Sequence, residues 1–193
     1  MSSTSPFRAS LDVGVEPEES PAAEAVSGER LRAVIHREHA FVWRSLRRLG
    51  VSAGDVDDAA QKVFLVAARK LGDVTPERER SFLFGVAVGV ASNERRSQER
   101  KRSAGADALE GMASSERSPE EIAGARALLD RVLEPLSIEL RSVLVLFELE
   151  QMTVEEIATM LGLPAGTVAS RLRRARELSL ASLEKIRKRG GTP

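Results

Sequence analysis

The chain lacks cysteine altogether, and it has only two histidines, His36 and His39, among 193 residues. The absence of cysteine excludes disulfide bonds, thiolate zinc sites and cysteine nucleophiles. The two histidines offer little material for a metal cluster, and a solvated helix face explains their spacing better than a pair of ligands. We therefore expect no metal and no other cofactor.

Long apolar runs are also missing from the sequence. A membrane-spanning helix needs about 18 consecutive apolar residues, and no stretch of this chain reaches that length. The first residues contain one early arginine, Arg8, and no apolar core, so they do not resemble a signal peptide. Both absences predict a cytoplasmic protein without a membrane partner.

Net charge is absent as well, but the charges are segregated along the chain. Basic and acidic residues number 29 each, which gives a formal net charge of +0. Residues 1–28 contain one basic and five acidic residues, whereas residues 165–189 contain eight basic and two acidic ones. Local charge sets the field that a phosphate meets. The C-terminal segment is therefore the candidate for binding nucleic acid.

Apolar periodicity predicts helices throughout and no credible sheet. The predicted fold class is all-α, with two small helical domains joined by a flexible linker, the second domain containing a helix-turn-helix. Ser, Pro, Glu and Ala dominate the first segment, and Ser, Ala, Gly and charged residues dominate the linker. The predicted boundaries are a disordered acidic tail (1–28), a first domain (29–102), a linker (103–118) and a second domain (119–189).

The segment 82–91 is locally ambiguous. Its large apolar residues alternate from Phe82 to Val90, as they would in a strand. Its two glycines also weaken a helix by about 1 kcal/mol each. However, no second strand is available for pairing, and a lone strand is not stable. We interpret the segment as a buried helix.

Residues 153–176 carry the most informative pattern. Thr153 and Glu156 have the spacing of a capping box, which predicts a helix start. Gly162 permits the positive φ of a tight turn between two helices. The residues expected to form the small core between these helices are Val154, Ile157, Leu161, Leu163, Val168 and Leu172.

The second helix of this pair presents a basic face. An arginine can bind O6 and N7 of guanine in bidentate fashion, and a helix of this kind fits the major groove of DNA. A plain basic amphipathic helix is the alternative, but the cap, the glycine turn and the basic face all coincide here. The candidate DNA-binding residues are Thr167, Ser170, Arg171, Arg173 and Arg174.

The stretch 153–176 resembles the promoter-binding domain that reads the −35 element in extracytoplasmic-function (ECF) sigma factors. The family pattern is L-S-Y-E-E-I-A-x-x-L-G-x-x-x-G-T-V-x-S-R-L-x-R-A-R, and nearly every fixed position is met. Thr153-Val154 replaces the usual Ser-Tyr. The resemblance implies that the basic face reads the −35 element.

A second motif supports the same family. The stretch from Asp55 to Phe64, Asp-Val-Asp-Asp-Ala-Ala-Gln-Lys-Val-Phe, resembles the family's D-A-E-D-L-V-Q-E-V-F. In the family this helix docks on the clamp helices of the β′ subunit of core RNA polymerase. Lysine stands here where the family usually has glutamate. The implied polymerase contacts are Asp57, Asp58, Gln61 and Lys62.

Residues 81–87, Ser-Phe-Leu-Phe-Gly-Val-Ala, resemble the family's S-W-L-Y-R-I-A, which binds the −10 element. A flipped-out base loses stacking, so the protein must supply compensating contacts. For each phenylalanine taken singly, core packing is the alternative. The implied −10 contacts are Arg78, Arg80, Phe82, Phe84, Arg95 and Arg96.

The resemblance implies a sigma factor that binds core RNA polymerase and directs promoter-specific transcription initiation, with no enzymatic activity of its own. Its partners would be the polymerase and promoter DNA, and the family adds an anti-sigma factor. The first alternative is a helix-turn-helix regulator that acts without polymerase docking, and the second is a structural helical adaptor. The third is a sigma factor that melts promoters poorly, because Gly85, Val88 and Gly89 leave few polar groups for DNA.

Overall fold

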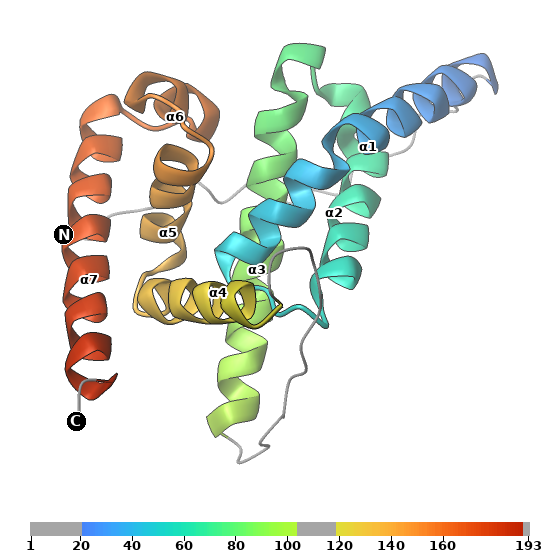
Figure 1. The fold of residues 1–193 in the computed structure, drawn as a ribbon. Coiled ribbons are helices and arrows are strands. Elements are labelled where there is room, and N and C mark those ends of the chain that lie inside the picture. The colour runs from blue at the N-terminus through green and yellow to red at the C-terminus, as the bar shows by residue number, and fades with distance from the viewer. Residues whose placement is uncertain (1–20, 104–118, 191–193) are drawn as a thin grey trace.

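The computed structural model describes residues 21–103 and 119–190. Within these ranges every regular element is helical and no strand is present (Figure 1). The first 20 residues of the predicted tail and nearly all of the predicted linker lie outside the described residues. The all-α prediction is confirmed.

The N-terminal unit consists of three α-helices that pack on one another. The first helix begins at Pro21, inside the predicted tail, and ends at Leu49, one residue before Gly50. Two short 3₁₀ helices connect the second and third α-helices. The elements are α1 (Pro21–Leu49), α2 (Val56–Lys70), η1 (Leu71–Asp73), η2 (Pro76–Arg78) and α3 (Glu79–Ser103).

The ambiguous segment 82–91 is helical, as interpreted, and lies inside α3. Its fully buried residues are Leu83, Phe84, Ala87 and Ala91. Their spacing of one, three and four residues is that of one helix face, not of a strand. The alternating residues Phe82, Val86, Val88 and Val90 are only partly buried, at the edges of this face. Their alternation in the sequence therefore does not reflect a strand.

The C-terminal unit contains four α-helices and one π-helical turn. The π-helical turn was not predicted from the sequence. It separates α5 from the two helices of the helix-turn-helix. Such turns are rare and often lie at functional sites. The elements are α4 (Pro119–Leu133), α5 (Ile138–Leu144), η3 (Val145–Leu149), α6 (Val154–Leu161) and α7 (Ala165–Gly190).

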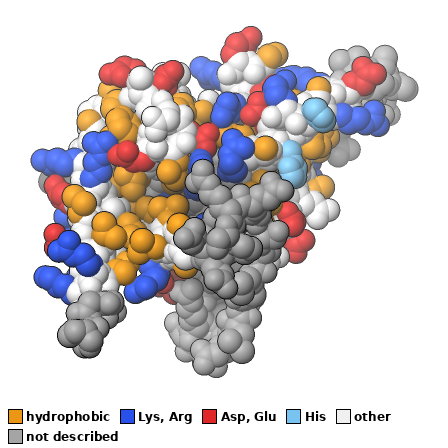
Figure 2. Space-filling view, viewed as in Figure 1, with side chains coloured by type: hydrophobic (Ala, Val, Ile, Leu, Met, Phe, Trp, Pro, Cys, Tyr) orange, Lys and Arg blue, Asp and Glu red, His pale blue; other side chains and the backbone are white. Residues whose placement is uncertain are grey.

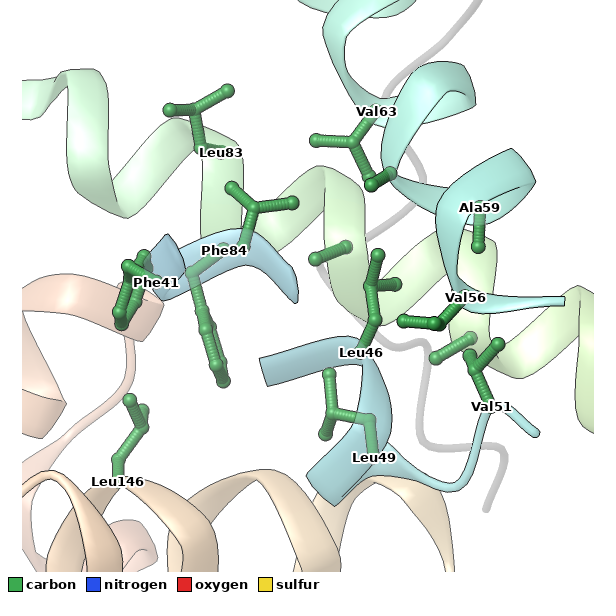
Figure 3. Close-up of a cluster of buried hydrophobic side chains, with 14 of the residues drawn as sticks. Phe41, Leu46, Leu49, Val51, Val56, Ala59, Val63, Leu83, Phe84 and Leu146 are labelled. Atoms are coloured by element: carbon green, nitrogen blue, oxygen red, sulfur yellow. The ribbon is translucent and has the colours of Figure 1, made fainter. Parts of the chain in front are cut away.

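The two units pack against each other and share one apolar cluster. The cluster runs from Val34 in α1 to Ala175 in α7 without a break. In Figure 3, Leu146 of η3 points toward Phe41 of α1 and Phe84 of α3. The rings of these two phenylalanines lie 6.0 Å apart between centroids. The units are therefore two in sequence but continuous in their apolar interior.

Candidate nucleic-acid and polymerase interface

The helix-turn-helix forms as the sequence predicts. Thr153 Oγ1 accepts a hydrogen bond from the backbone N–H of Glu156 at 3.2 Å, and the Glu156 carboxylate accepts one from the Thr153 N–H at 2.7 Å. Both bonds that Thr153 donates to this carboxylate lower the pKa of Glu156. The bond from the backbone N–H has the larger effect, and the bond from the Thr153 hydroxyl has the smaller one. Gly162 follows in the left-handed conformation, with φ of 63°. This turn sets the angle at which α7 leaves α6.

The first turns of α7 place the five predicted −35 residues on one side of the helix. Ser170, Arg173 and Arg174 are exposed, and the other two are half-buried. The side chains of Arg173 and Arg174 are 80% and 61% exposed. They pair with Glu177 at 4.0 Å and 3.2 Å, respectively. Exposed pairs of this kind contribute little to stability. Phosphates can therefore replace Glu177 at small cost.

The predicted polymerase-binding residues lie on the outer face of α2. Asp58, Gln61 and Lys62 are exposed there. Lys62 pairs with Glu94 of α3 at 2.6 Å, and this hydrogen bond raises the pKa of Lys62. Asp57 is also exposed and accepts a hydrogen bond from the indole N–H of Trp43 at 2.9 Å.

Leu65 completes this face of α2 and was not predicted. Leu65 is 53% exposed, although α2 packs on both α1 and α3. It lies three and four residues after Lys62 and Gln61, so it shares their face. The helical spacing could have identified it from the sequence.

The predicted −10 residues do not form one cluster. Arg78 ends η2, and Arg80, Phe82 and Phe84 lie in the first turns of α3. Arg95 and Arg96 lie farther along the same helix, at about 1.5 Å per residue, or roughly 20 Å away. A single base pocket cannot use both groups.

These six residues also differ in accessibility. Arg78, Arg80 and Arg96 are exposed, and Phe82 is half-buried. Phe84 is completely buried, so in this conformation its ring presents no surface to a base. Phe84 therefore packs in the core, which was the alternative interpretation of this residue from the sequence.

Arg80 and Arg95 are bound by other parts of the protein. The Arg80 guanidinium lies 4.0 Å from the centroid of the Phe41 ring and 3.5 Å from the carboxylate of Glu150 in the C-terminal unit. Arg95 donates hydrogen bonds to the backbone carbonyls of Glu134 at 3.3 Å and Leu136 at 3.0 Å. Both arginines therefore contact the other unit.

Comparison with known proteins places this arrangement in a family. The family model described as Sigma-70 region 2 matches residues 34–101, and the one described as Sigma-70, region 4 matches residues 126–178. The ECF RNA polymerase sigma-E factor of Escherichia coli K12 is 34% identical over 139 residues, which cover 66% of this chain and 73% of that protein. The ECF RNA polymerase sigma factor SigL of Mycobacterium tuberculosis is 32% identical over 169 residues, covering 83% and 94%.

The chain belongs to the ECF sigma factors. The family inferred from the two motifs is therefore confirmed, together with the two-domain helical fold class. Among solved structures, CnrH in complex with the cytosolic domain of CnrY is 25% identical, with a TM-score of 0.62 over 85% of this chain and 94% of that one. The sigma factor RpoE of Bartonella quintana, solved with the anti-sigma factor NepR, shares the fold at 23% identity, with a TM-score of 0.51 over 78% and 96%.

In this sigma factor the connection before α3 is fixed by a buried carboxylate that the sequence analysis did not single out. Glu79 is 3% exposed and pairs with Arg30 at 2.8 Å and with Arg37, both from α1. Arg30 also donates to the carbonyl of Val74, between η1 and η2. These bonds attach the connection to α1. The alternating charges of residues 77–80 were the only feature of the sequence that could have indicated these ion pairs.

The sigma factor also exposes an apolar patch where α4 meets α7. Figure 2 shows apolar side chains gathered on this face, beside basic side chains of α7. On α4 the exposed leucines are Leu128 and Leu129, and on α7 they are Leu180 and Leu183. Among the described residues, no helix is both long and apolar enough to cross a bilayer, and no group of histidines or carboxylates could hold a metal ion.

Proposed function

We propose that this sigma factor binds core RNA polymerase through α2 of its N-terminal unit and reads the −35 element with the start of α7. The observation that carries the proposal is that one chain combines an exposed acidic and polar face on α2 with a complete helix-turn-helix. Both lie inside the segments matched by the two family models. Catalysis would belong to the polymerase, and the protein would act in the cytoplasm, where the polymerase and the chromosome are.

For the polymerase contact, the proposed residues are Asp57, Asp58, Gln61 and Lys62, with Leu65 added from the structure. Charged and polar groups around an exposed leucine match the polar rim and apolar centre of typical protein interfaces. Lys62 enters this contact already paired with Glu94, so its charge is partly compensated. The β′ clamp helices are the proposed partner, by analogy with the family.

For the −35 contact, the proposed roles differ along α7. Thr167 and Ser170 lie at the start of the helix, where a recognition helix meets base edges. Arg171, Arg173 and Arg174 follow and supply charge for guanine edges or for phosphates. Each phosphate contact should add to the salt dependence of binding.

For the −10 contact, the exposed candidates are Arg78, Arg80 and Arg96, and Phe82 is half-buried. Phe84 would support the surface from below, because it is buried. Arg95 can reach DNA only after it leaves the two carbonyls of the C-terminal unit, whereas the Arg80 side chain is 50% exposed beside Glu150. An anti-sigma factor is a further proposed partner, and the exposed leucines of α4 and α7 are an apolar surface suited to such a protein.

Run-off transcription tests the proposed function. Core polymerase with the full chain, on fragments of the source genome, should give transcripts with defined starts that polymerase alone does not give. Arg173→Ala and Arg174→Ala should each reduce these transcripts and lower the salt slope of promoter binding by about one phosphate contact. Arg187→Ala, an exposed arginine near the far end of α7, is the matched control.

A negative transcription result separates two alternatives to the proposed function. If the chain co-elutes with core polymerase but no transcript appears, the proposed promoter reading is wrong. If the chain neither co-elutes nor gives transcripts, yet binds specific duplex DNA alone, the stand-alone regulator replaces the sigma factor as the function.

A further inference from the structure

Three arginines from three helices gather near Gly50. Arg47 belongs to α1, Arg95 to α3 and Arg141 to α5. Gly50 has a φ of 104°, and an added Cβ there would lie 3.2 Å from the Arg141 guanidinium and 3.3 Å from Cδ of Arg95. The side chains of Arg95 and Arg141 therefore flank one point, the position that a side chain at residue 50 would otherwise occupy.

Arg141 is almost completely buried and keeps one nitrogen unsatisfied. Its side chain is 3% exposed, and its Nε donates to the backbone carbonyl of Arg48 at 2.6 Å. Its Nη2 is buried and has no hydrogen-bond partner among the described residues, since the nearby carboxylate of Asp130 is 3.6 Å away. A buried donor without a partner is costly, so this nitrogen calls for an acceptor.

Arg95 supplies a second nitrogen of this kind. Its Nη2 donates to the carbonyls of Glu134 and Leu136, but its Nη1 is buried and also lacks a partner within the described part of the chain. Two neighbouring guanidinium groups therefore each leave one buried nitrogen unsatisfied. Water could accept a hydrogen bond from either nitrogen, but it would not compensate their charge.

The cluster also carries more positive than negative charge. The charges that act on Arg141 are those of Arg95 and Arg47 and those of the carboxylates Asp130 and Glu134, so the five groups sum to 3 − 2 = +1. Burial in the first place, and then the charge of Arg95, lower the pKa of Arg141 to about 10. One further negative charge would remove the excess.

The nearest other carboxylate of the C-terminal unit is already engaged. Glu150 pairs with Arg48 and, at 3.5 Å, with Arg80. Solvent reaches the arginine cluster on another side, beside Arg47 and Asp130, whose side chains are 21% and 47% exposed. A small ion could therefore enter there.

We infer that one free phosphate ion binds between Arg95 and Arg141. Its oxygens would accept hydrogen bonds from the unsatisfied nitrogens of both arginines, and its charge would offset the excess of the cluster. Phosphate suits these groups because the planar fork of a guanidinium matches its oxygens. The inference is independent of the proposed function, because it involves neither polymerase nor promoter DNA.

Thermal unfolding of the full chain gives the first test. A ligand that binds only the folded state stabilises it as the ligand concentration rises. Inorganic phosphate at about 10 mM should raise the Tm by at least about 2 °C relative to chloride at the same ionic strength. No rise in the parent protein overturns the phosphate site.

Matched arginine substitutions locate the effect. Arg95→Met and Arg141→Met each remove one of the two proposed ligands and should abolish the rise in Tm. Arg44→Met removes the same charge from an exposed position on α1 and should keep the rise. If Arg141→Met does not fold, Arg95→Met decides alone. The site is wrong if Arg95→Met responds to phosphate as strongly as Arg44→Met does.

The side-chain resonance of Arg141 provides a direct readout in the parent protein. Its Nε–H is bonded to the Arg48 carbonyl, so heteronuclear NMR should detect it, and its loss in Arg141→Lys assigns it. The resonance should shift with inorganic phosphate to saturation, with a midpoint below about 10 mM, and should not shift with chloride. Phosphate on the exposed basic face of α7 would leave it unchanged. Absence of the shift would mean that water satisfies both nitrogens.

ATP distinguishes a free phosphate from one that belongs to a nucleotide. A site this deeply buried should admit the free ion more readily, so we expect ATP to shift the Arg141 resonance less than an equal concentration of phosphate does. A larger shift with ATP would overturn the assignment of the free ion. Neither result depends on transcription, so a failure of sigma activity would leave the phosphate site unaffected.

Discussion

At the scale of single residues, burial separates the charges that support the fold from those that remain available to a ligand. Glu79 is 3% exposed and is bound by two arginines, whereas the Arg173 side chain is 80% exposed and meets only another surface residue. The energetic consequences differ accordingly, because an unpaired buried charge is costly and an unpaired surface charge is not.

Replacing Glu79 tests the structural class of charge. Glu79→Ala leaves Arg30 and Arg37 without their shared carboxylate, so we expect the free energy of unfolding to fall by about 1–3 kcal/mol. The estimate is at the lower end for buried pairs because both arginines are partly exposed. Urea denaturation measures it. Glu29→Ala, an exposed acid on α1, is the control and should change stability little. Equal effects of the two substitutions would refute the argument.

The capping carboxylate of α6 gives a prediction in pH. Hydrogen bonds from Thr153 lower the pKa of Glu156, so the ionised form is favoured by folding. The contribution to stability is therefore complete above the unfolded pKa of about 4.3 and is lost as the pH falls through the lower folded pKa. Carboxyl NMR should show that the pKa of Glu156 lies below that of an ordinary glutamate. Thr153→Ala removes the hydroxyl bond but keeps the backbone N–H, so the pKa should move only part of the way back up. An unchanged pKa would show that the hydroxyl bond is not one of the causes.

At the scale of elements, the sequence predicts well where local rules dominate. The capping box at Thr153 and the turn at Gly162 involve residues close in sequence, and both are present. The segment 82–91 required a tertiary argument, the absence of a strand partner, because its local pattern favoured a strand. The π-helical turn after Leu144 has no recognisable local signal and was missed.

Two glycines in different settings should respond oppositely to alanine. Gly162 has a φ of 63°, which an L side chain rarely adopts, so Gly162→Ala should lower the free energy of unfolding by about 1–2 kcal/mol. Gly89 lies inside α3 with nothing within 4 Å of an added Cβ, so Gly89→Ala should raise it by about 0.5–1 kcal/mol. Thermal unfolding followed by circular dichroism measures both. If both substitutions changed the free energy of unfolding in the same direction, the argument from backbone conformation would be wrong.

At the scale of the whole molecule, the sequence predicted two domains but not their contact. Apolar patterning predicts that the helix containing Phe84 is buried, but it does not indicate that Leu146 packs near that residue. The partners of Arg48 and Arg80 likewise lie about 70 to 100 positions away in the chain. No rule of local spacing connects residues so distant, and this is why three predicted −10 residues were not expected to meet the C-terminal unit.

Contact between the units should make them unfold together. Leu146 is completely buried and lies in the apolar cluster that both units share, so Leu146→Ala should cost about 2–5 kcal/mol and weaken their coupling. The single tryptophan, Trp43, reports the N-terminal unit, whereas helical circular dichroism reports both units. In the parent protein the two denaturation curves should coincide.

In Leu146→Ala we expect circular dichroism to fall before Trp43 fluorescence changes, because the C-terminal unit loses the support of the larger N-terminal core. Leu180→Ala, at a side chain that is 62% exposed, is the control and should leave the curves coincident. Curves that separate already in the parent would mean that the shared cluster contributes little coupling.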